Sequence, residues 1–141
     1  MINGQTNGDY SGFSVSSAGD VNGDGLADLI VGAYGADPND ERSAGSSYVV
    51  FGTTDTSAIE LSAVAAGSGG FIINGQTTDD YSGFSVSSAG DVNADGLADL
   101  IIPLLLPVRL PHPRRPSWVP LTKKLKSFYV RPSPSYCHNC F

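Results

Sequence analysis

The first 102 residues contain no cysteine and no histidine, and Arg42 is their only basic residue. Without cysteine, this segment has no disulfide and no thiolate metal site. Without histidine or cysteine, it cannot form a Ser-His or Cys-His nucleophile system either. Its 14 acids argue against nucleic acid as a partner, because phosphate contacts need clustered Lys and Arg. These absences favour a non-enzymatic segment whose natural complement is a cation.

Long apolar runs are also missing. No segment reaches the roughly 18 consecutive apolar residues that a membrane-spanning helix needs. The chain starts Met1-Ile2-Asn3-Gly4, without the basic start and apolar run of a signal peptide. We therefore expect no membrane span, and 141 residues allow one globular domain at most.

A repeat organises the acidic segment. Residues 2–30 align with residues 73–101 at a period of 71, and 26 of the 29 aligned positions are identical. Short apolar runs alternate with clusters of Gly, Asn, Asp and Ser, which is typical of short antiparallel strands joined by tight turns. The predicted strands are residues 11–17, with Phe13 and Val15 on one face, 29–31, 48–51 and 71–73, the last with residues 1–2 as its earlier copy. Residues 59–66 fit either one helical turn or a packed loop. Four strands per repeat is the content of one β-propeller blade, so the sequence predicts an all-β fold.

Each copy of the repeat contains a nine-residue acidic loop, residues 20–28 and 91–99. Acidic or amide side chains occupy positions 1, 3, 5 and 9, and glycine occupies position 6. Calcium takes roughly six to eight oxygen ligands, so a loop that binds it must direct several carboxylates and carbonyls to one point. Alternate side chains of a tight loop turn inward, and the glycine permits the backbone angle that directs the next carbonyl to the ion. The predicted calcium ligands are Asp20, Asn22, Asp24, the Leu26 carbonyl and Asp28 in the first copy, and Asp91, Asn93, Asp95, the Leu97 carbonyl and Asp99 in the second.

Two rival interpretations of the loop are weaker. An EF-hand needs a carboxylate at position 12 and a helix on either side, but position 12 here is Val31 or Ile102, inside a β-like run. The loop is therefore expected at the bend of a β-hairpin. Asp, Asn and Gly are also ordinary turn formers. Turn formation alone, however, does not explain why mutually repelling carboxylates gather twice.

The segment Gly12–Ala36, GFSVSSAGDVNGDGLADLIVGAYGA, resembles the FG-GAP repeat of integrin alpha-chain N-terminal regions and of bacterial integrin-alpha-like proteins. The resemblance implies that each repeat is one blade of a seven-bladed β-propeller and that the acidic loop is a calcium-binding hairpin of the form DxDxDGxxD. It assigns the same ten ligand positions. Three departures from the family pattern, Asn at position 3, Ala94 for Gly at position 4 and Tyr34 for the Pro of GAP, remove no ligand. The resemblance covers residues 2–102, so about one and a half blades are expected.

The repeat pattern breaks after residue 102. Residues 103–141 contain no glycine and no acid, but seven bases and eight of the nine prolines. A basic, proline-rich interaction tail and a shifted reading frame both fit this composition. We favour the frameshift, because the break falls inside a strand and not at a linker. The sequence thus divides into an FG-GAP region, residues 1–102, and a non-propeller tail, residues 103–141, that is expected to be disordered.

The expected function is that of a calcium-binding fragment of an integrin-alpha-like propeller. By resemblance, its role would be extracellular or at the cell surface, in adhesion to a protein or a surface glycan. Two alternatives stay open: a non-catalytic propeller portion of a secreted hydrolase, and a non-functional product of a frameshifted gene. One and a half blades cannot close a ring, so the chain is expected to be marginally stable unless it associates.

Overall fold

The computed structural model describes residues 1–104 and the backbone of residues 127–130. The elements are β1 (Ile2–Asn3), β2 (Ser14–Gly19), β3 (Asp28–Ala33), a 3₁₀ turn (Pro38–Asp40), β4 (Ser46–Val50), β5 (Ile59–Glu60), α1 (Leu61–Ala65), β6 (Gly70–Asn74), β7 (Ser87–Gly90), β8 (Asp99–Pro103) and β9 (Ser127–Val130). Within these residues no helix is both long enough and apolar enough to cross a membrane.

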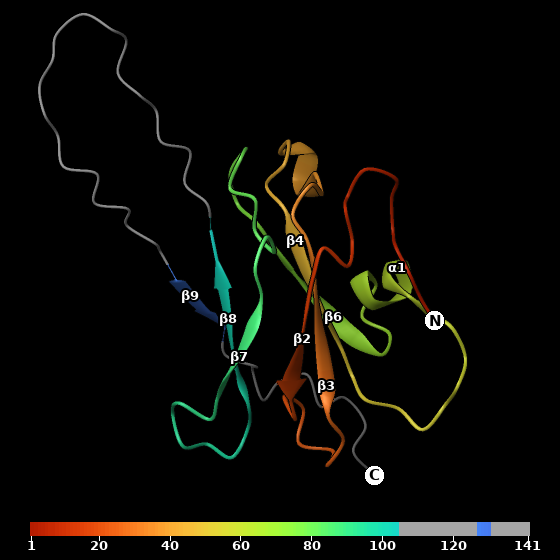
Figure 1. The fold of residues 1–141 in the computed structure, drawn as a ribbon, viewed down its shortest axis with the longest axis vertical. Coiled ribbons are helices and arrows are strands. Elements are labelled where there is room, and N and C mark those ends of the chain that lie inside the picture. Colours follow the sequence, from red (N-terminus) through yellow and green to blue (C-terminus); the bar gives the residue numbers. More distant parts are fainter. Residues whose placement is uncertain (105–126, 131–141) are drawn as a thin grey trace, which may run out of the picture.

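Two antiparallel sheets form the body of the structure (Figure 1). The first has the strand order β2-β3-β4-β6 and contains one whole repeat, and the second has the order β7-β8-β9. In Figure 1 the second sheet lies on one side of the first, and α1 lies on the other. The prediction of an all-β fold is confirmed, and the two sheets are one complete blade and one partial blade of a β-propeller.

The strands lie close to where the sequence placed them. The predicted strands 29–31, 48–51 and 71–73 fall within or overlap β3, β4 and β6, and residues 59–66 form β5 followed by α1. β2 begins three residues later than the predicted strand 11–17, because residues 10–13 form a turn. In that turn the N–H of Phe13 donates to the carbonyl of Tyr10 at 3.1 Å, and Gly12 has a φ of 88°.

Both faces of the first sheet are covered by apolar side chains. The cluster between the two sheets consists of Ala18, Val21, Ile30, Val49, Val86, Leu100 and Ile102. The cluster on the opposite face, beneath α1, consists of Val31, Ala33, Ala36, Tyr48, Val50, Leu61 and Val64. Full burial of a Val, Leu or Ile side chain contributes about 1.5–3 kcal/mol, so both the blade-to-blade contact and the helix contribute to stability.

β1 pairs differently from its copy in the second repeat. Ile2 lies opposite Ile59 in a parallel pair with β5, whereas Ile73, its equivalent in β6, lies opposite Ser47 in an antiparallel pair with β4. The backbone groups of β1 are thus satisfied by the short strand β5.

β9 adds four residues of the proline-rich segment to the second sheet. It runs antiparallel to β8, with Val130 opposite Leu100, in the register in which Val50 lies opposite Leu29 in the first blade. The sequence predicted no propeller strand here, so residues 127–130 depart from that expectation. An unpaired edge of β8 accepts any segment of high β-propensity, and Ser-Phe-Tyr-Val is such a segment. The rest of the predicted tail, residues 105–126 and 131–141, lies outside the described residues.

Candidate functional site

The two acidic loops connect equivalent strands of the two blades. Residues 20–27 join β2 to β3 in an antiparallel hairpin, and residues 91–98 join β7 to β8. The position of the loop at a hairpin bend is therefore as predicted. Figure 1 shows both loops at the same end of the molecule. They are in contact, because the N–H of Ala98 donates to the carbonyl of Asp20 at 3.0 Å.

Side chains of the first loop turn inward onto its own backbone. Asp20 accepts at Oδ1 from the N–H of Gly23 at 2.7 Å and from that of Asp24 at 3.2 Å, and at Oδ2 from the N–H of Gly25 at 2.9 Å. Asn22 Oδ1 accepts from the N–H of Asp24 at 3.0 Å. Asp24 Oδ1 accepts from the N–H of the next residue but one, Leu26, at 2.8 Å. Positions 1, 3 and 5 thus each accept hydrogen bonds from N–H groups of the loop itself.

The second loop repeats this arrangement nearly bond for bond. Asp91 Oδ2 accepts from the N–H of Gly96 at 2.9 Å, and its Oδ1 accepts from that of Asp95 at 3.1 Å. Asn93 Oδ1 accepts from the N–H of Asp95 at 2.8 Å, and Asp95 Oδ1 from that of Leu97 at 2.9 Å. The same residue types at the same spacing therefore fold the same way in both blades.

Position 9 is buried in both loops and joins the loop to its blade. Asp28 Oδ2 accepts from the N–H of Val21 at 2.8 Å, and its Oδ1 accepts from the N–H of Gly52 at 2.7 Å. Asp99 Oδ2 accepts in the same way from the N–H of Val92 at 2.8 Å. Asp28 therefore bonds both to the backbone of its own loop and to Gly52, which follows β4.

The pKa of the Asp28 carboxyl is raised above its ordinary value. Burial is the largest cause, because a charged carboxylate loses hydration there, and the N–H groups of Gly52 and Val21 oppose it. The negative charges of Asp24 and Asp20 raise this pKa further. The three carboxylates of the first loop therefore lie close enough to affect one another's charge.

Two glycine positions control the loop backbone. Gly25 and Gly96, at position 6, have φ values of 84° and 89°, in the left-handed region that glycine adopts without strain. Position 4 also has a positive φ, 80° at Gly23 and 59° at Ala94. The position-6 angle is as the sequence predicted, and Ala94 adopts the same region as an L-residue.

All ten predicted ligand residues lie in the two loops, but the carboxylates do not already form a closed metal cluster. Across the part of the chain that the structure describes, no three Asp, Glu, His or Cys side chains are grouped closely enough to hold a metal ion by themselves. Within the first loop, the amide Nδ2 of Asn22 donates to Asp24 Oδ2 at 2.8 Å. The side chains at positions 1, 3 and 5 therefore bond to the backbone of the loop, and position 9 is buried in the blade.

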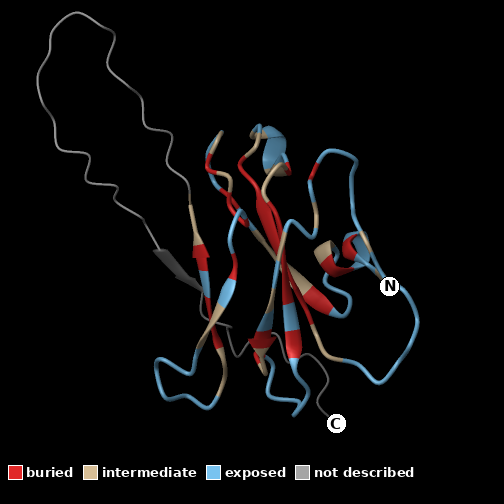
Figure 2. Ribbon diagram, in the orientation of Figure 1, coloured by how far each residue is buried: buried red, intermediate tan, exposed pale blue. Residues whose placement is uncertain are grey.

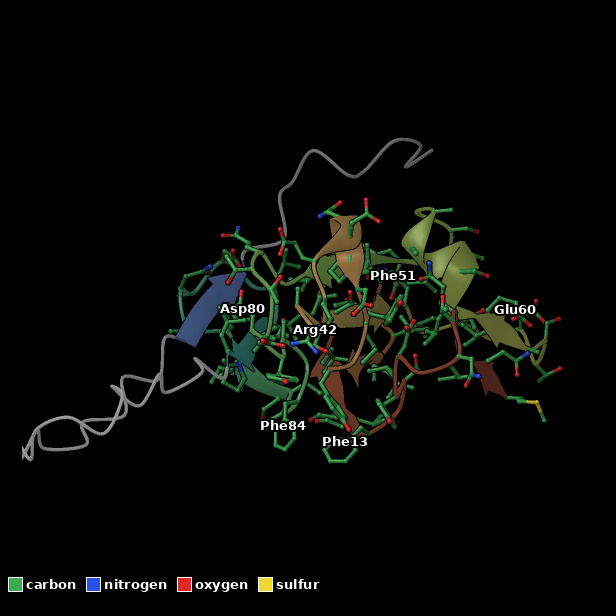
Figure 3. All side chains as sticks on the ribbon, turned by 90° about the horizontal axis from the view of Figure 1, so that it is seen from above. Phe13, Arg42, Phe51, Glu60, Asp80 and Phe84 are labelled. Carbon is green, nitrogen blue, oxygen red and sulfur yellow. The ribbon has the colours of Figure 1, made fainter. Side chains whose placement is uncertain are left out.

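A partly exposed aromatic cluster lies at the other end of the blades, before β2 and β7 and just after β3, and the sequence analysis did not identify it. Its members are Tyr10, Phe13, Tyr34, Tyr81 and Phe84. The ring of Tyr34 stacks on that of Tyr10 with centroids 5.0 Å apart, and the rings of Phe13 and Phe84 lie 5.2 Å apart. Figure 3 shows Phe13 and Phe84 side by side, pointing away from the ribbon. The signal was present in the sequence, since Tyr10 and Tyr81, like Phe13 and Phe84, are 71 residues apart.

Comparisons with known proteins agree with this architecture. The family model of the FG-GAP repeat matches residues 11–50, which include β2, the first acidic loop, β3 and β4. Residues 11–50 of the chain are an FG-GAP repeat. The chain is also similar to integrin alpha-E of Mus musculus, with 34% identity over 107 residues, and this alignment covers 70% of the chain. The same alignment spans 8% of the integrin, so the FG-GAP chain corresponds to a small part of that relative.

Proposed function

We propose that the two acidic loops of this FG-GAP protein bind calcium and that the blades serve as a non-catalytic, extracellular or cell-surface binding module. One observation carries the proposal. The same inward hydrogen-bond arrangement of Asp, Asn and Asp at positions 1, 3 and 5 forms in both loops. The similarity to integrin alpha-E supports the cellular setting.

The donor chemistry of each loop fits calcium. Positions 1, 3, 5 and 9 offer carboxylate or amide oxygens, position 7 offers a carbonyl, and calcium takes oxygen ligands of this kind. A carboxylate oxygen that accepts one backbone N–H retains a further lone pair for an ion. Bound calcium would also relieve the repulsion that raises the pKa of Asp28.

Binding requires a local rearrangement, because the carboxylates are not yet grouped as a metal cluster. The hydrogen bond from Asn22 Nδ2 to Asp24 Oδ2 would have to break so that both residues direct oxygens to the ion. Calcium tolerates irregular and flexible ligand shells, whereas magnesium demands a near-octahedral one. An exposed loop that closes on its ion therefore favours calcium over magnesium.

The aromatic cluster supports the binding role. Exposed, contiguous apolar surface marks interaction sites, and aromatic side chains contribute most of the binding energy at such sites. The cluster lies at the opposite end of β2 from the acidic loop, so calcium bound there would stabilise the blades without occupying the aromatic surface. Its partner, a protein or a surface glycan, would be bound by stacking and apolar contact.

Thermal unfolding with calcium or magnesium tests the metal part of the proposal. A site at 100-fold excess of ligand over its Kd gains about 2.7 kcal/mol, which raises Tm by roughly 10–20 °C in a domain of this size. Asp24→Asn with Asp95→Asn should remove this shift, and Asn22→Ala should reduce it less than Asp24→Ala, because an amide provides a neutral ligand and a carboxylate a charged one. Asp40→Asn is the matched control, since it removes an exposed charge outside the loops. Equal shifts with both ions, or full shifts in the double variant, would reject the calcium sites.

Attachment of cultured cells to the immobilised chain tests the adhesion part. Phe13→Ser combined with Phe84→Ser should abolish attachment, and Ile2→Ser, which removes another exposed apolar side chain, should not. Attachment that is unchanged in the double variant would separate the aromatic cluster from any binding role.

A further inference from the structure

The two acidic loops differ in sequence only at position 4, directly after the asparagine at position 3. The first loop has Asn22-Gly23, whereas the second has Asn93-Ala94, and all four residues are exposed. In an asparagine-glycine pair, the backbone nitrogen of the glycine can attack the amide carbon of the asparagine, because no Cβ hinders the approach. The exchange of Gly for Ala therefore leaves the two loops unequally open to a reaction within the chain.

A carboxylate lies against the nitrogen that would attack in the first loop. The N–H of Gly23 donates to Asp20 Oδ1 at 2.7 Å. A general base needs to lie within roughly 2.6–3.2 Å of the group whose proton it takes, so Asp20 can accept this proton as the new bond forms. Among the described hydrogen bonds of the second loop, none joins Asp91 to the N–H of Ala94.

The amide of Asn22 is held at both of its polar atoms. Its Oδ1, on which negative charge develops during the attack, accepts from the N–H of Asp24 at 3.0 Å. Its Nδ2, the leaving nitrogen, donates to Asp24 Oδ2 at 2.8 Å, and this second bond fixes the plane of the amide. Asn93 has only the first of these contacts among the described bonds, from the N–H of Asp95 at 2.8 Å. The first loop therefore places a proton acceptor and an oxyanion donor around one amide.

We propose that the first loop promotes the loss of its own Asn22 side-chain amide, so that Asn22 is a site of self-modification. The Gly23 nitrogen forms a bond to Asn22 Cγ and gives its proton to Asp20. The bond between Cγ and Nδ2 then breaks, and Nδ2 leaves as ammonia with that proton. Water opens the resulting cyclic imide at one of its two carbonyls, which leaves an aspartate or an isoaspartate at position 22. One water is consumed and one ammonia is released, so no other reactant is needed.

The modification changes the charge of the loop. The aspartate product adds a carboxylate to those of Asp20, Asp24 and Asp28, while the second loop keeps its amide at Asn93. Calcium affinity depends on the charge of the ligands, so this product should bind calcium more tightly, and the isoaspartate product, which lengthens the main chain of the loop, should bind it more weakly. This consequence rests on the proposed calcium sites, whereas the loss of the amide does not.

Incubation of the 141-residue chain with a chelator, both folded and unfolded in urea, tests the proposal. Cleavage after Arg42 places Asn22 and Asn93 on different peptides, and tandem mass spectrometry then follows the loss of each amide. Asn7-Gly8 is the internal reference, since it is an exposed pair in which no described bond joins a carboxylate to the glycine N–H. In the folded chain, we expect Asn22 to react about tenfold or more faster than Asn93. The ratio of the Asn22 rate to the Asn7 rate should also be higher in the folded chain than in urea.

A matched pair of variants tests the part that Asp20 plays. Asp20→Asn keeps an acceptor oxygen but removes the base, so it should slow the loss of the Asn22 amide about tenfold or more and leave Asn7 unchanged. Asp40→Asn removes an exposed charge outside the loops and should change neither rate. Far-UV circular dichroism establishes that both variants are folded. If Asp20→Asn does not fold, the comparison of the folded and unfolded wild-type chain decides.

Two results would overturn the proposal. One is a ratio of the Asn22 rate to the Asn7 rate that is equal or lower in the folded chain than in urea, because the loop would then protect the amide. The other is a folded Asp20→Asn variant in which Asn22 reacts as fast as in the wild type. A chain that shows the expected rates but no calcium response in calorimetry would refute the calcium sites and leave this modification site in place.

Discussion

Position 4 of the acidic loop offers a prediction in which two reverse exchanges, one in each copy, change stability in opposite directions. Gly23 has a φ of 80°, and Ala94, its equivalent, has a φ of 59°. An L-residue in the left-handed region costs roughly 1–2 kcal/mol, whereas glycine costs about 0.5–1 kcal/mol in backbone entropy. The difference predicts that Ala94→Gly stabilises the fold by about 0.5–1 kcal/mol and that Gly23→Ala destabilises it by about the same amount.

Packing changes this expectation little. A Cβ at Gly23 would lie 3.3 Å from Leu97 Cδ2, which is the end of a flexible side chain, and Ala94 is exposed. Urea unfolding with a chelator present measures both variants without any contribution from bound metal. The midpoint should shift in opposite directions at an unchanged m value. If Ala94→Gly lowers the free energy of unfolding by about 0.5–1 kcal/mol, backbone entropy alone explains the effect, and the left-handed conformation of Ala94 is refuted.

Three further predictions concern single side chains. In urea unfolding, Gly19→Ala should lower the free energy of unfolding by about 1–3 kcal/mol more than Gly90→Ala does. Both positions have a positive φ, but only at Gly19 would the added Cβ overlap Ala98. Equal losses in the two variants would contradict the contact between the blades. Asp28→Ala should cost about 3 kcal/mol, since it leaves the N–H groups of Val21 and Gly52 without their acceptor, while Asp55→Ala, in an exposed turn, should cost less than about 0.5 kcal/mol. Arg42→Ala should change stability by less than about 1 kcal/mol, because the Arg42 side of its ion pair with the half-buried Asp79 is exposed; a larger loss would mean that this pair connects the blades.

The hairpins and acidic loops could be predicted from the sequence because their causes are local. Asp20 and Gly25 shape one loop through bonds that span five residues, and the alternation of apolar runs with turn residues places β3 and β4. The nearly identical second copy then predicts the same loop again. The confirmed all-β fold rests on these short-range signals.

The remaining features depend on contacts between distant residues. The predicted strand placed Phe13 on one face with Val15, but a turn at Gly12 directs Phe13 into the aromatic cluster with Phe84. The pairing of β1 with β5 and of β9 with β8 follows from which strand edges lack a partner, and no local pattern indicates that. The sequence also gives no distances between carboxylates, so it could not show that Asp20, Asp24 and Asp28 are not yet grouped as a metal cluster.

Isothermal titration of the 141-residue chain with calcium tests the central claim most directly. Two acidic loops with the same hydrogen bonds predict two calcium ions per chain, and a weaker response to magnesium. Asp24→Asn should leave one site, and Asp24→Asn with Asp95→Asn should leave none, while Asp40→Asn keeps both. Absence of a calcium response in the wild-type chain, or two sites remaining in the double variant, would contradict calcium binding by these loops.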